Sequence, residues 1–511
     1  MVSTPVTPQN SGRTYLPDAV TEATSPNQLL FPLTAQVNSK DRLEIGGCDV
    51  TELVRQFGSP LYILDEATLR TTCRQYRDAF KRYYPGESQV IYASKAWSCL
   101  AVCAIAASEG LGMDVVSGGE LHTALKAGVA PTKIYFHGNN KSHGELEFAV
   151  ETGCTVVVDN WFELKTLAAI AGSRSQVSQS VSGSTEASRN VRRESGVREG
   201  DGEDNGDGEM FSLPPSSSSP SLSPTRVMIR LTPGIECHTH EYIRTGHIDS
   251  KFGFDPNQLD EVFQFLSQQS ALSCIGLHAH IGSQIFELQP HQDLGGVMVQ
   301  WLTKAAQYGL PIRELNIGGG LGICYTETDD PPSIDAWVKV VAESLATACQ
   351  AQQLPYPKVL SEPGRSLIGS ACVTAYTVGS QKTIPGIRQY ISVDGGMSDN
   401  PRPITYQSVY RAVIANRMSA LADQTVTIAG KHCESGDILI KDAKLAEAHP
   451  GDILVIPATG AYNYSMSSNY NRIPRPAAVI VNAGEANLIL QRETYADLIR
   501  QDRLPERLRQ P

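Results

Sequence analysis

The chain has 511 residues, of which 41% are hydrophobic, and can bury a core large enough for two domains. Its formal net charge of -11 and the lack of a basic cluster argue against a nucleic-acid or anionic-membrane partner, since neutralising phosphates requires clustered Lys and Arg. The 11 cysteines show no paired CxxC spacing, which predicts neither a disulfide framework nor a metal site and indicates a reducing compartment.

Residues 1–27 are rich in Ser, Thr and Pro and are predicted to form a disordered tail. They lack the basic start and apolar core of a secretory signal, and no apolar run in the chain is long enough to span a bilayer. A single Arg13 beside Asp18 and Glu22 argues against an organelle transit peptide. The sequence therefore predicts a cytoplasmic protein without a membrane partner.

Residues 58–370 alternate short β-branched or aromatic runs with amphipathic helical stretches, a pattern typical of parallel strands joined by crossover helices. The predicted strands cover residues 89–93, 113–116, 133–136, 155–158, 227–231, 274–278, 314–318 and 358–361. Eight such units predict an α/β fold in the form of a closed (β/α)8 barrel.

Residues 173–225 interrupt this pattern with Ser-rich, Gly/Asp/Glu-rich and Ser/Pro-rich sequence, and are predicted to be disordered. They follow the fourth predicted helix and precede the fifth strand, so they form an insertion in the barrel and not a domain linker. Such loops lie opposite the active-site end of a barrel. Deleting about residues 173–223 is therefore expected to leave turnover largely intact.

Lys95 follows the first predicted strand, at the end of the barrel where active sites are built. A lysine there can be desolvated and kept partly neutral, as reaction with an aldehyde cofactor requires, although a solvated strand cap is the ordinary alternative. Polar residues also follow the other strands. They include residues 117–119, His137, Asp159, Arg230, His280, Ser283, Gly318, Gly319, Gly320, Glu362, Gly364 and Arg365.

Three of these features have a specific chemical interpretation. The glycines at 318–320 follow strand seven and let backbone N–H groups approach an anion, and Arg365 on the next loop can add a charged contact to a phosphate. Glu362 requires a cationic partner, either a pyridinium nitrogen or Arg365 or Arg230. His280 can stack on a flat cofactor or be an ordinary core residue. Together with Lys95 these features describe a pyridoxal phosphate site.

The chain carries these features in the order Tyr92-Ala93-Ser94-Lys95-Ala96, His280-x-Gly282-Ser283-Gln284, Gly318-Gly319-Gly320 and Glu362-Pro363-Gly364-Arg365. This order resembles the alanine-racemase-like (fold-type III) decarboxylases that use pyridoxal 5'-phosphate, and among them those that act on diaminopimelate. The resemblance covers about residues 29–493 apart from the insertion. It implies that Lys95 binds the cofactor aldehyde, His280 stacks on the ring and Glu362 pairs with the ring nitrogen. By the same resemblance the phosphate is surrounded by Ser283, Gly318, Gly319, Gly320, Gly364 and Arg365, with Arg365 serving phosphate, substrate or both.

Residues 371–511 contain strand runs without helices between them and are predicted to form a C-terminal β domain. The predicted strands cover residues 371–378, 389–393, 424–428, 438–441, 453–457, 477–481 and 486–490. The resemblance implies that strands within residues 28–57, at 42–45 and 49–51, complete this domain.

Three motifs of the β domain bear on the substrate. Arg402 and Tyr406 offer a bidentate cation and a phenol suited to a carboxylate, although an Arg-Pro pair is often only a loop anchor. A free cysteine such as Cys433 is ordinarily a small buried hydrophobe. The resemblance implies instead that its loop enters the active site of the neighbouring subunit of a homodimer. There Cys433 donates a proton and Glu434 binds the distal amine of the substrate, while Tyr462 touches cofactor phosphate and substrate.

The resemblance thus implies decarboxylation of meso-2,6-diaminopimelate to L-lysine and CO2, the last step of lysine biosynthesis. The alternatives are a decarboxylase of ornithine, lysine or arginine on the same scaffold, or a noncatalytic cofactor-binding homologue. A racemase is a third alternative, for which no tyrosine base stands in the required context. A distal group with both amine and carboxylate calls for a cation and an acid together, which Arg402 and Glu434 supply, whereas a diamine precursor leaves the arginine without a partner.

Overall fold

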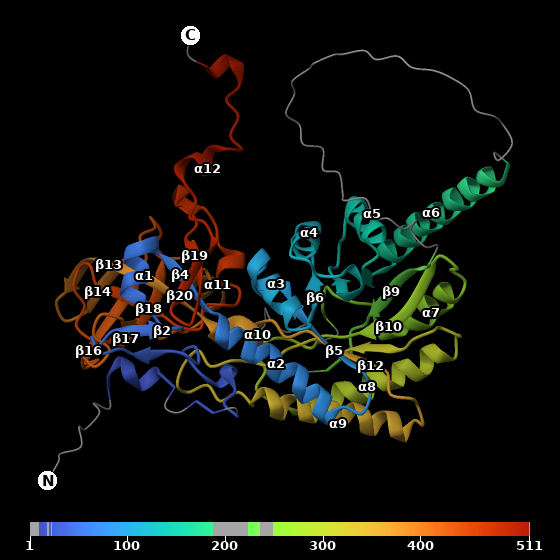
Figure 1. Ribbon diagram of the computed structural model, residues 1–511, viewed down its shortest axis with the longest axis horizontal. Coiled ribbons are helices and arrows are strands. Elements are labelled where there is room, and N and C mark those ends of the chain that lie inside the picture. The colour runs from blue at the N-terminus through green and yellow to red at the C-terminus, as the bar shows by residue number, and fades with distance from the viewer. Residues whose placement is uncertain (1–9, 18–19, 22, 188–222, 236–248, 510–511) are drawn as a thin grey trace.

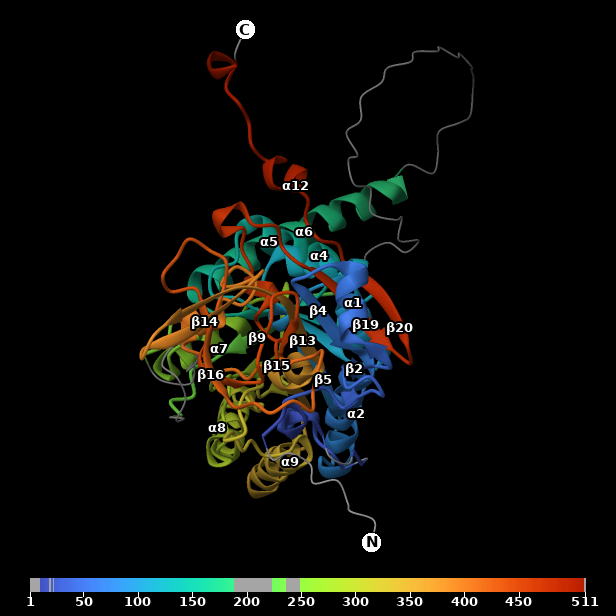
Figure 2. The same ribbon diagram turned by 90° about the vertical axis from the view of Figure 1, so that its left-hand side faces the viewer.

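The computed structural model describes residues 10–17, 20–21, 23–187, 223–235 and 249–509, without side chains for residues 175–187. A closed barrel lies at one end of the molecule and a largely antiparallel sheet at the other (Figure 1). In the view turned by 90° the sheet lies in front of the barrel (Figure 2). Among the described residues, none of the helices combines the length and the apolar character needed to cross a bilayer.

The barrel consists of eight parallel strands in the order β10-β11-β12-β5-β6-β7-β8-β9, which confirms the predicted fold. The strands are β5 (Ser88–Ala93), β6 (Gly112–Val115), β7 (Ile134–Phe136), β8 (Thr155–Val158), β9 (Thr225–Arg230), β10 (Leu272–His278), β11 (Glu314–Asn316) and β12 (Lys358–Ser361). A cluster of buried side chains from six of these strands fills the inside of the barrel, as its close packing requires. The members are Ile91, Tyr135, Val157, Met228, Ile275 and Leu360.

Helices surround the barrel. They are α2 (Glu66–Tyr83), α3 (Leu100–Ser108), α4 (Gly118–Lys126), α5 (His143–Thr152), α6 (Trp161–Ala187), α7 (Leu259–Ser267), α8 (Gln289–Ala306), α9 (Ile334–Ala351) and the short α10 (Arg365–Ile368). Of these helices, α2, α4, α5 and α9 begin at a capping side chain. Ser142 and Glu145 form a reciprocal capping box at the start of α5, and Gly153 ends that helix in a left-handed conformation with φ of 76°. The apolar faces of the helices pack against the outer faces of the barrel strands in the largest core of the molecule.

Helix α6 corrects the predicted start of the insertion. The prediction of disorder from residue 173 is wrong for residues 173–187, which continue the helix from Trp161 to Ala187. The segment contains no proline, so each further residue can add one backbone hydrogen bond to the helix. The remainder of the insertion up to residue 222 lies outside the described residues.

The second sheet has nine strands in the β domain, in the order β17-β16-β14-β13-β4-β19-β20, with β18 pairing to β13 and β15. The strands are β4 (Leu61–Asp65), β13 (Cys372–Ile384), β14 (Arg388–Val393), β15 (Val413–Ile414), β16 (Gln424–Ala429), β17 (Ile438–Leu445), β18 (Ile453–Ile456), β19 (Ala477–Asn482) and β20 (Glu485–Leu490). Each of the seven predicted strands has a counterpart. The short helices α11 (Arg402–Tyr406) and α12 (Tyr495–Ile499) lie outside the sheet.

Strand β4 shows that the predicted division at residue 58 is wrong. The strand falls within the predicted barrel range, residues 58–370, but it lies in the middle of the second sheet, antiparallel to β13 and parallel to β19. The stretch expected to complete that sheet forms a separate three-stranded sheet of β1 (Gln36–Val37), β2 (Leu43–Ile45) and β3 (Cys48–Asp49). The strand predicted at 49–51 gives way to α1 (Val50–Phe57), because the Asp49 carboxylate accepts the amides of Thr51 and Glu52 as a helix cap.

The N-terminal segment is also more ordered than predicted. The short 3-10 helix Pro26–Gln28 lies against the barrel loops, and its Asn27 is fully buried. The Asn27 amide donates to the carbonyl oxygens of Gly322 and Pro332, at 3.1 and 2.9 Å. The prediction of a disordered tail over residues 1–27 is therefore wrong for Pro26 and Asn27, because these hydrogen bonds fix them to the fold. Residues 1–9, 18–19 and 22 lie outside the described residues.

Candidate active site

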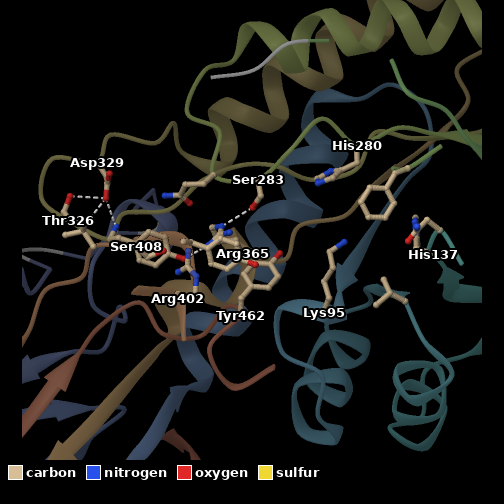
Figure 3. A pocket seen from close by; sticks show the side chains of 18 of the residues that line it. Lys95, His137, His280, Ser283, Thr326, Asp329, Arg365, Arg402, Ser408 and Tyr462 are labelled. Atoms are coloured by element: carbon tan, nitrogen blue, oxygen red, sulfur yellow. Dashed lines mark hydrogen bonds between the residues drawn. The ribbon is translucent and has the colours of Figure 1, made fainter. Parts of the chain in front are cut away.

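A cavity of about 840 Å³ opens at the carboxyl ends of the barrel strands and extends to the β domain (Figure 3). Its wall brings together side chains that the sequence places more than 300 residues apart. Predicted site residues in the wall are Lys95, His280, Ser283, Arg365, Arg402, Tyr406 and Tyr462. Barrel strand ends and β-domain loops thus line one cavity.

Lys95 lies in the one-turn helix Ser94–Ala96 directly after β5, and its side chain points into the cavity (Figure 3). Its Nζ lies 3.3 Å from Oδ2 of Asp114, a buried carboxylate at the end of the neighbouring strand β6. Burial lowers the pKa of Lys95, but the charge of Asp114, with Tyr462 and Glu362 farther away, outweighs it and raises the pKa above its ordinary value. The expectation of a partly neutral lysine is therefore wrong for this structure, in which Lys95 is an ammonium beside Asp114.

Glu362 at the end of β12 is the centre of a buried hydrogen-bond network. Its Oε1 accepts from Asn316 Nδ2 at 2.6 Å and lies 2.9 Å from Nε2 of His137. Its Oε2 lies 3.3 Å from Nε2 of His278. Burial raises the pKa of Glu362, but the contacts with His137 and His278 outweigh it and hold the pKa well below its usual range. Glu362 is therefore an anion. Within the described residues it forms no ion pair with Arg365 or Arg230, the alternative partners that the sequence left open.

The imidazole of His278 supports Glu362 as a neutral donor. Burial lowers the pKa of His278 to about 3, although Glu362 acts in the opposite direction. His278 and His137 pack edge to face, with ring centres 4.7 Å apart. The neutral His278 imidazole and the Asn316 amide can each donate one N–H to the carboxylate, which compensates for its loss of water.

The glycines after β11 bring backbone close to the loop after β10. Gly318 has φ of +66°, and a Cβ there would lie 2.6 Å from Nδ1 of His280, so a side chain does not fit. The Gly319 N–H donates to the same His280 nitrogen at 3.3 Å. This contact fixes the His280 ring, toward which the Lys95 side chain extends (Figure 3).

A narrow recess leads from the cavity toward the glycine loop. Its lining includes Ser283, Gly320, Gly364, Arg365 and Tyr462. The guanidinium of Arg365 donates through Nε to the Ser283 hydroxyl at 3.1 Å. One fixed cation, a hydroxyl and glycine backbone are the donors that a phosphate requires, so the recess fits the phosphate of the implied cofactor.

Tyr462 belongs to the β domain but is attached to the barrel beside Lys95. Its N–H donates to the carbonyl of Ala96 at 2.8 Å, and its backbone has φ of +65°, a conformation that non-glycine residues rarely adopt. The Arg365 guanidinium carbon lies 4.8 Å from the centre of the Tyr462 ring. Tyr462 thus lines the recess together with Arg365.

Arg402 and Tyr406 lie at the two ends of α11 and line the cavity at the β-domain side. Arg402 is 6% exposed and donates to the hydroxyl of Tyr410 at 2.7 Å. Figure 3 shows Arg402 and Arg365 near each other on the side of the cavity away from His137.

The structure does not bring Cys433 and Glu434 into this cavity. Both residues are exposed on the loop between β16 and β17, and the Cys433 N–H donates to Oδ1 of Asn471 at 2.9 Å. Of the ten cysteines in the described residues, nine are buried, whereas Cys433 is exposed. The ordinary expectation of a buried hydrophobic cysteine is therefore wrong for Cys433.

Several residues of the site were not assigned a role from the sequence. Asp114, His137, His278 and Asn316 all end or follow a barrel strand, and that position is the signal that could have identified them. Tyr325, which lines the cavity from the loop after β11, carried no such signal.

Comparison with known proteins agrees with the geometry. The profile of the family described as "Pyridoxal-dependent decarboxylase, pyridoxal binding domain" matches residues 66–198 and 216–369, more than half of the chain. Diaminopimelate decarboxylase of Synechocystis sp. is 60% identical over 99% of this chain and 100% of its own length. Diaminopimelate decarboxylase of Bacillus subtilis is 42% identical over 92% of this chain and 97% of its own length.

Solved structures give the same relationship. Diaminopimelate decarboxylase from M. jannaschii, in complex with L-lysine, superposes with a TM-score of 0.78 at 29% identity, covering 95% of this chain and 100% of that chain. The chain belongs to the diaminopimelate decarboxylase family of pyridoxal-dependent decarboxylases, as its motifs implied.

Proposed function

We propose that this protein removes CO2 from meso-2,6-diaminopimelate to give L-lysine, using pyridoxal 5'-phosphate. The observation that carries the proposal is the pairing, in one cavity, of Lys95 with the buried cations Arg365 and Arg402. This set suits an amino acid that has a second carboxylate. Diaminopimelate decarboxylases are also the relatives that match nearly the full chain.

The residues of the barrel have distinct tasks in this reaction. Pyridoxal phosphate, when bound, supplies an aldehyde for the substrate amine and a ring that withdraws electrons from the carbon losing CO2. Lys95 would hold the aldehyde, and His280 would pack against the ring. The anionic Glu362 holds a proton at the ring nitrogen, which strengthens the electron withdrawal. Ser283, Arg365 and the glycine loop bind the phosphate.

The remaining residues act on the substrate. Arg402 and Tyr406 bind the distal carboxylate. Arg365 lines the same wall of the cavity and can also bind this carboxylate.

We further propose that the active form is a homodimer with shared sites. The support is the exposed position of Cys433 and Glu434, outside the cavity that holds Lys95. In the dimer the partner's Cys433 donates a proton from Sγ to the carbon that has lost CO2, and the partner's Glu434 binds the distal ammonium. The ten cysteines of the described residues are free thiols, which supports a reducing, cytoplasmic location.

Release of CO2 from meso-diaminopimelate, L-lysine, L-ornithine and L-arginine tests the substrate. We expect meso-diaminopimelate to be preferred by kcat/KM. Each of the other three amino acids has its only carboxylate at the reacting carbon, and therefore offers no second carboxylate to Arg402. Preference for ornithine would contradict the proposed substrate and leave the fold and cofactor assignments intact. No CO2 release from any of the four would favour the noncatalytic alternative.

A further inference from the structure

Two buried phenols hold the guanidinium groups at the substrate side of the cavity. Arg402 donates through Nη1 to the Tyr410 hydroxyl at 2.7 Å. Arg365 donates through Nη1 to the Tyr325 hydroxyl at 2.6 Å. The guanidinium carbon of Arg402 also lies 4.7 Å from the centre of the Tyr325 ring, and the two tyrosine rings meet edge to face at 5.3 Å.

All four side chains are buried, so the two guanidinium charges are placed there at a cost in desolvation free energy. Arg365 and Arg402 are 5% and 6% exposed, and Tyr410 is fully buried. Within the part of the chain that the structure describes, neither guanidinium forms an ion pair with a carboxylate. Phenol oxygens and ring faces therefore replace the anion that a buried arginine usually requires. Two cations without a carboxylate partner remain available to an anionic ligand.

The loop after β11 fixes the position of Tyr325. One carboxylate oxygen of Asp329 accepts the backbone N–H groups of Tyr325 and Thr326, at 2.9 and 2.8 Å. These contacts close a tight turn, so the phenol faces the arginines from a fixed backbone. Burial raises the pKa of the Tyr325 phenol, but Arg365 and Arg402 outweigh it and bring the pKa below its ordinary value.

Resting on the proposed function, we propose that Tyr410 and Tyr325 determine specificity for the second carboxylate of the substrate by holding Arg402 and Arg365 in the geometry that receives it. Tyr410 is a positioning residue, because it lies behind Arg402 and is not part of the cavity wall. An arginine side chain has many rotamers, and fixing its planar group before binding reduces the entropy lost when a carboxylate is bound. Tyr325 has the same role for Arg365 from within the wall.

The test compares binding of the product L-lysine with binding of 1,5-diaminopentane. Bound as product, L-lysine has its terminal amine at the reacting end, so its one carboxylate is the distal carboxylate of the substrate, and 1,5-diaminopentane lacks that group. Both are measured as competitive inhibitors of the holoenzyme. For Tyr410→Phe we expect L-lysine to bind about tenfold more weakly, the size of one lost hydrogen bond to a charged group. We expect 1,5-diaminopentane to change by less than about twofold, and KM for meso-diaminopimelate to rise while kcat changes by less than about threefold.

Tyr84→Phe is the matched control, because its buried hydroxyl also makes one 2.7 Å hydrogen bond, to the Pro357 carbonyl at the opposite end of the barrel. Equal weakening of both inhibitors, or unchanged L-lysine binding, in Tyr410→Phe would overturn the inference. If that variant does not fold, Tyr325→Phe decides by the same ratio of inhibition constants. A wild-type enzyme that binds both inhibitors equally would instead contradict the proposed substrate.

Discussion

The ammonium of Lys95 lies 3.3 Å from the carboxylate of Asp114, which is 1% exposed. The pair joins the ends of two neighbouring barrel strands, and it raises the pKa of Lys95 against the effect of burial. Because the aldehyde of the cofactor reacts with the neutral amine, we expect this contact to slow the uptake of cofactor.

Asp114→Asn is therefore expected to speed loading at neutral pH and to shift the pH profile of loading to lower pH. The neutral fraction of Lys95 rises about tenfold for each unit by which its pKa falls. The measurement is the rate at which enzyme stripped of cofactor takes up pyridoxal phosphate, followed by absorbance across pH. Asp78→Asn, an exposed acid on α2, is the control. Identical profiles for Asp114→Asn and wild type would rule out this function of the contact.

Glu362→Gln is expected to lower kcat/KM by about a hundredfold or more while cofactor remains bound, since an amide cannot stabilise a proton on the ring nitrogen as an anion does. The measurement is steady-state CO2 release together with the cofactor content of the purified variant. Glu314→Gln is the control, because Glu314 is a buried carboxylate at the other end of the barrel, bonded to Tyr135. Activity near wild type in Glu362→Gln would contradict the role of Glu362.

His291→Leu is expected to flatten the pH dependence of stability. His291 is buried beside Trp337, and burial lowers its pKa to about 3. The unfolded chain, with a histidine pKa of about 6.5, binds a proton that the native protein excludes. The stability contributed by neutral His291 is thus complete above about pH 6.5 and is lost as pH falls toward 3. The slope of the free energy of unfolding between pH 5 and 6 is expected to decrease by about 1 kcal/mol per pH unit.

Urea denaturation at several pH values measures this slope, with His122→Leu on the exposed surface of α4 as control. His278 contributes with the same sign and remains in both variants. An unchanged slope in His291→Leu would show that His291 takes up its proton without unfolding.

The barrel could be predicted from the sequence because each strand and helix carries its own local pattern. Strand β4 could not be assigned correctly, because a run of buried residues directly before a helix has the same pattern in either sheet. Its membership is decided by pairing with Cys372 and Ala477, more than 300 residues away. The order around Asn27 likewise depends on carbonyl groups of distant loops, which composition does not reveal.

The rim of the site could be predicted because active-site residues of barrels stand at strand ends. The support of Glu362 by His137, His278 and Asn316 could not, since it depends on distances across the barrel mouth. For the same reason the pKa of Lys95 shifts opposite to the expectation. Desolvation could be read from its own strand, whereas Asp114 lies on the next one.

The central claim is that one active site combines Lys95 of one chain with Cys433 of another. Lys95→Ala and Cys433→Ala are each expected to be nearly inactive alone. After the two are mixed under conditions that exchange subunits, half of the dimers are hybrids with one intact site, so about one quarter of wild-type CO2 release is expected. If hybrids form, as shown by two different affinity tags, and activity does not return, the shared site is contradicted.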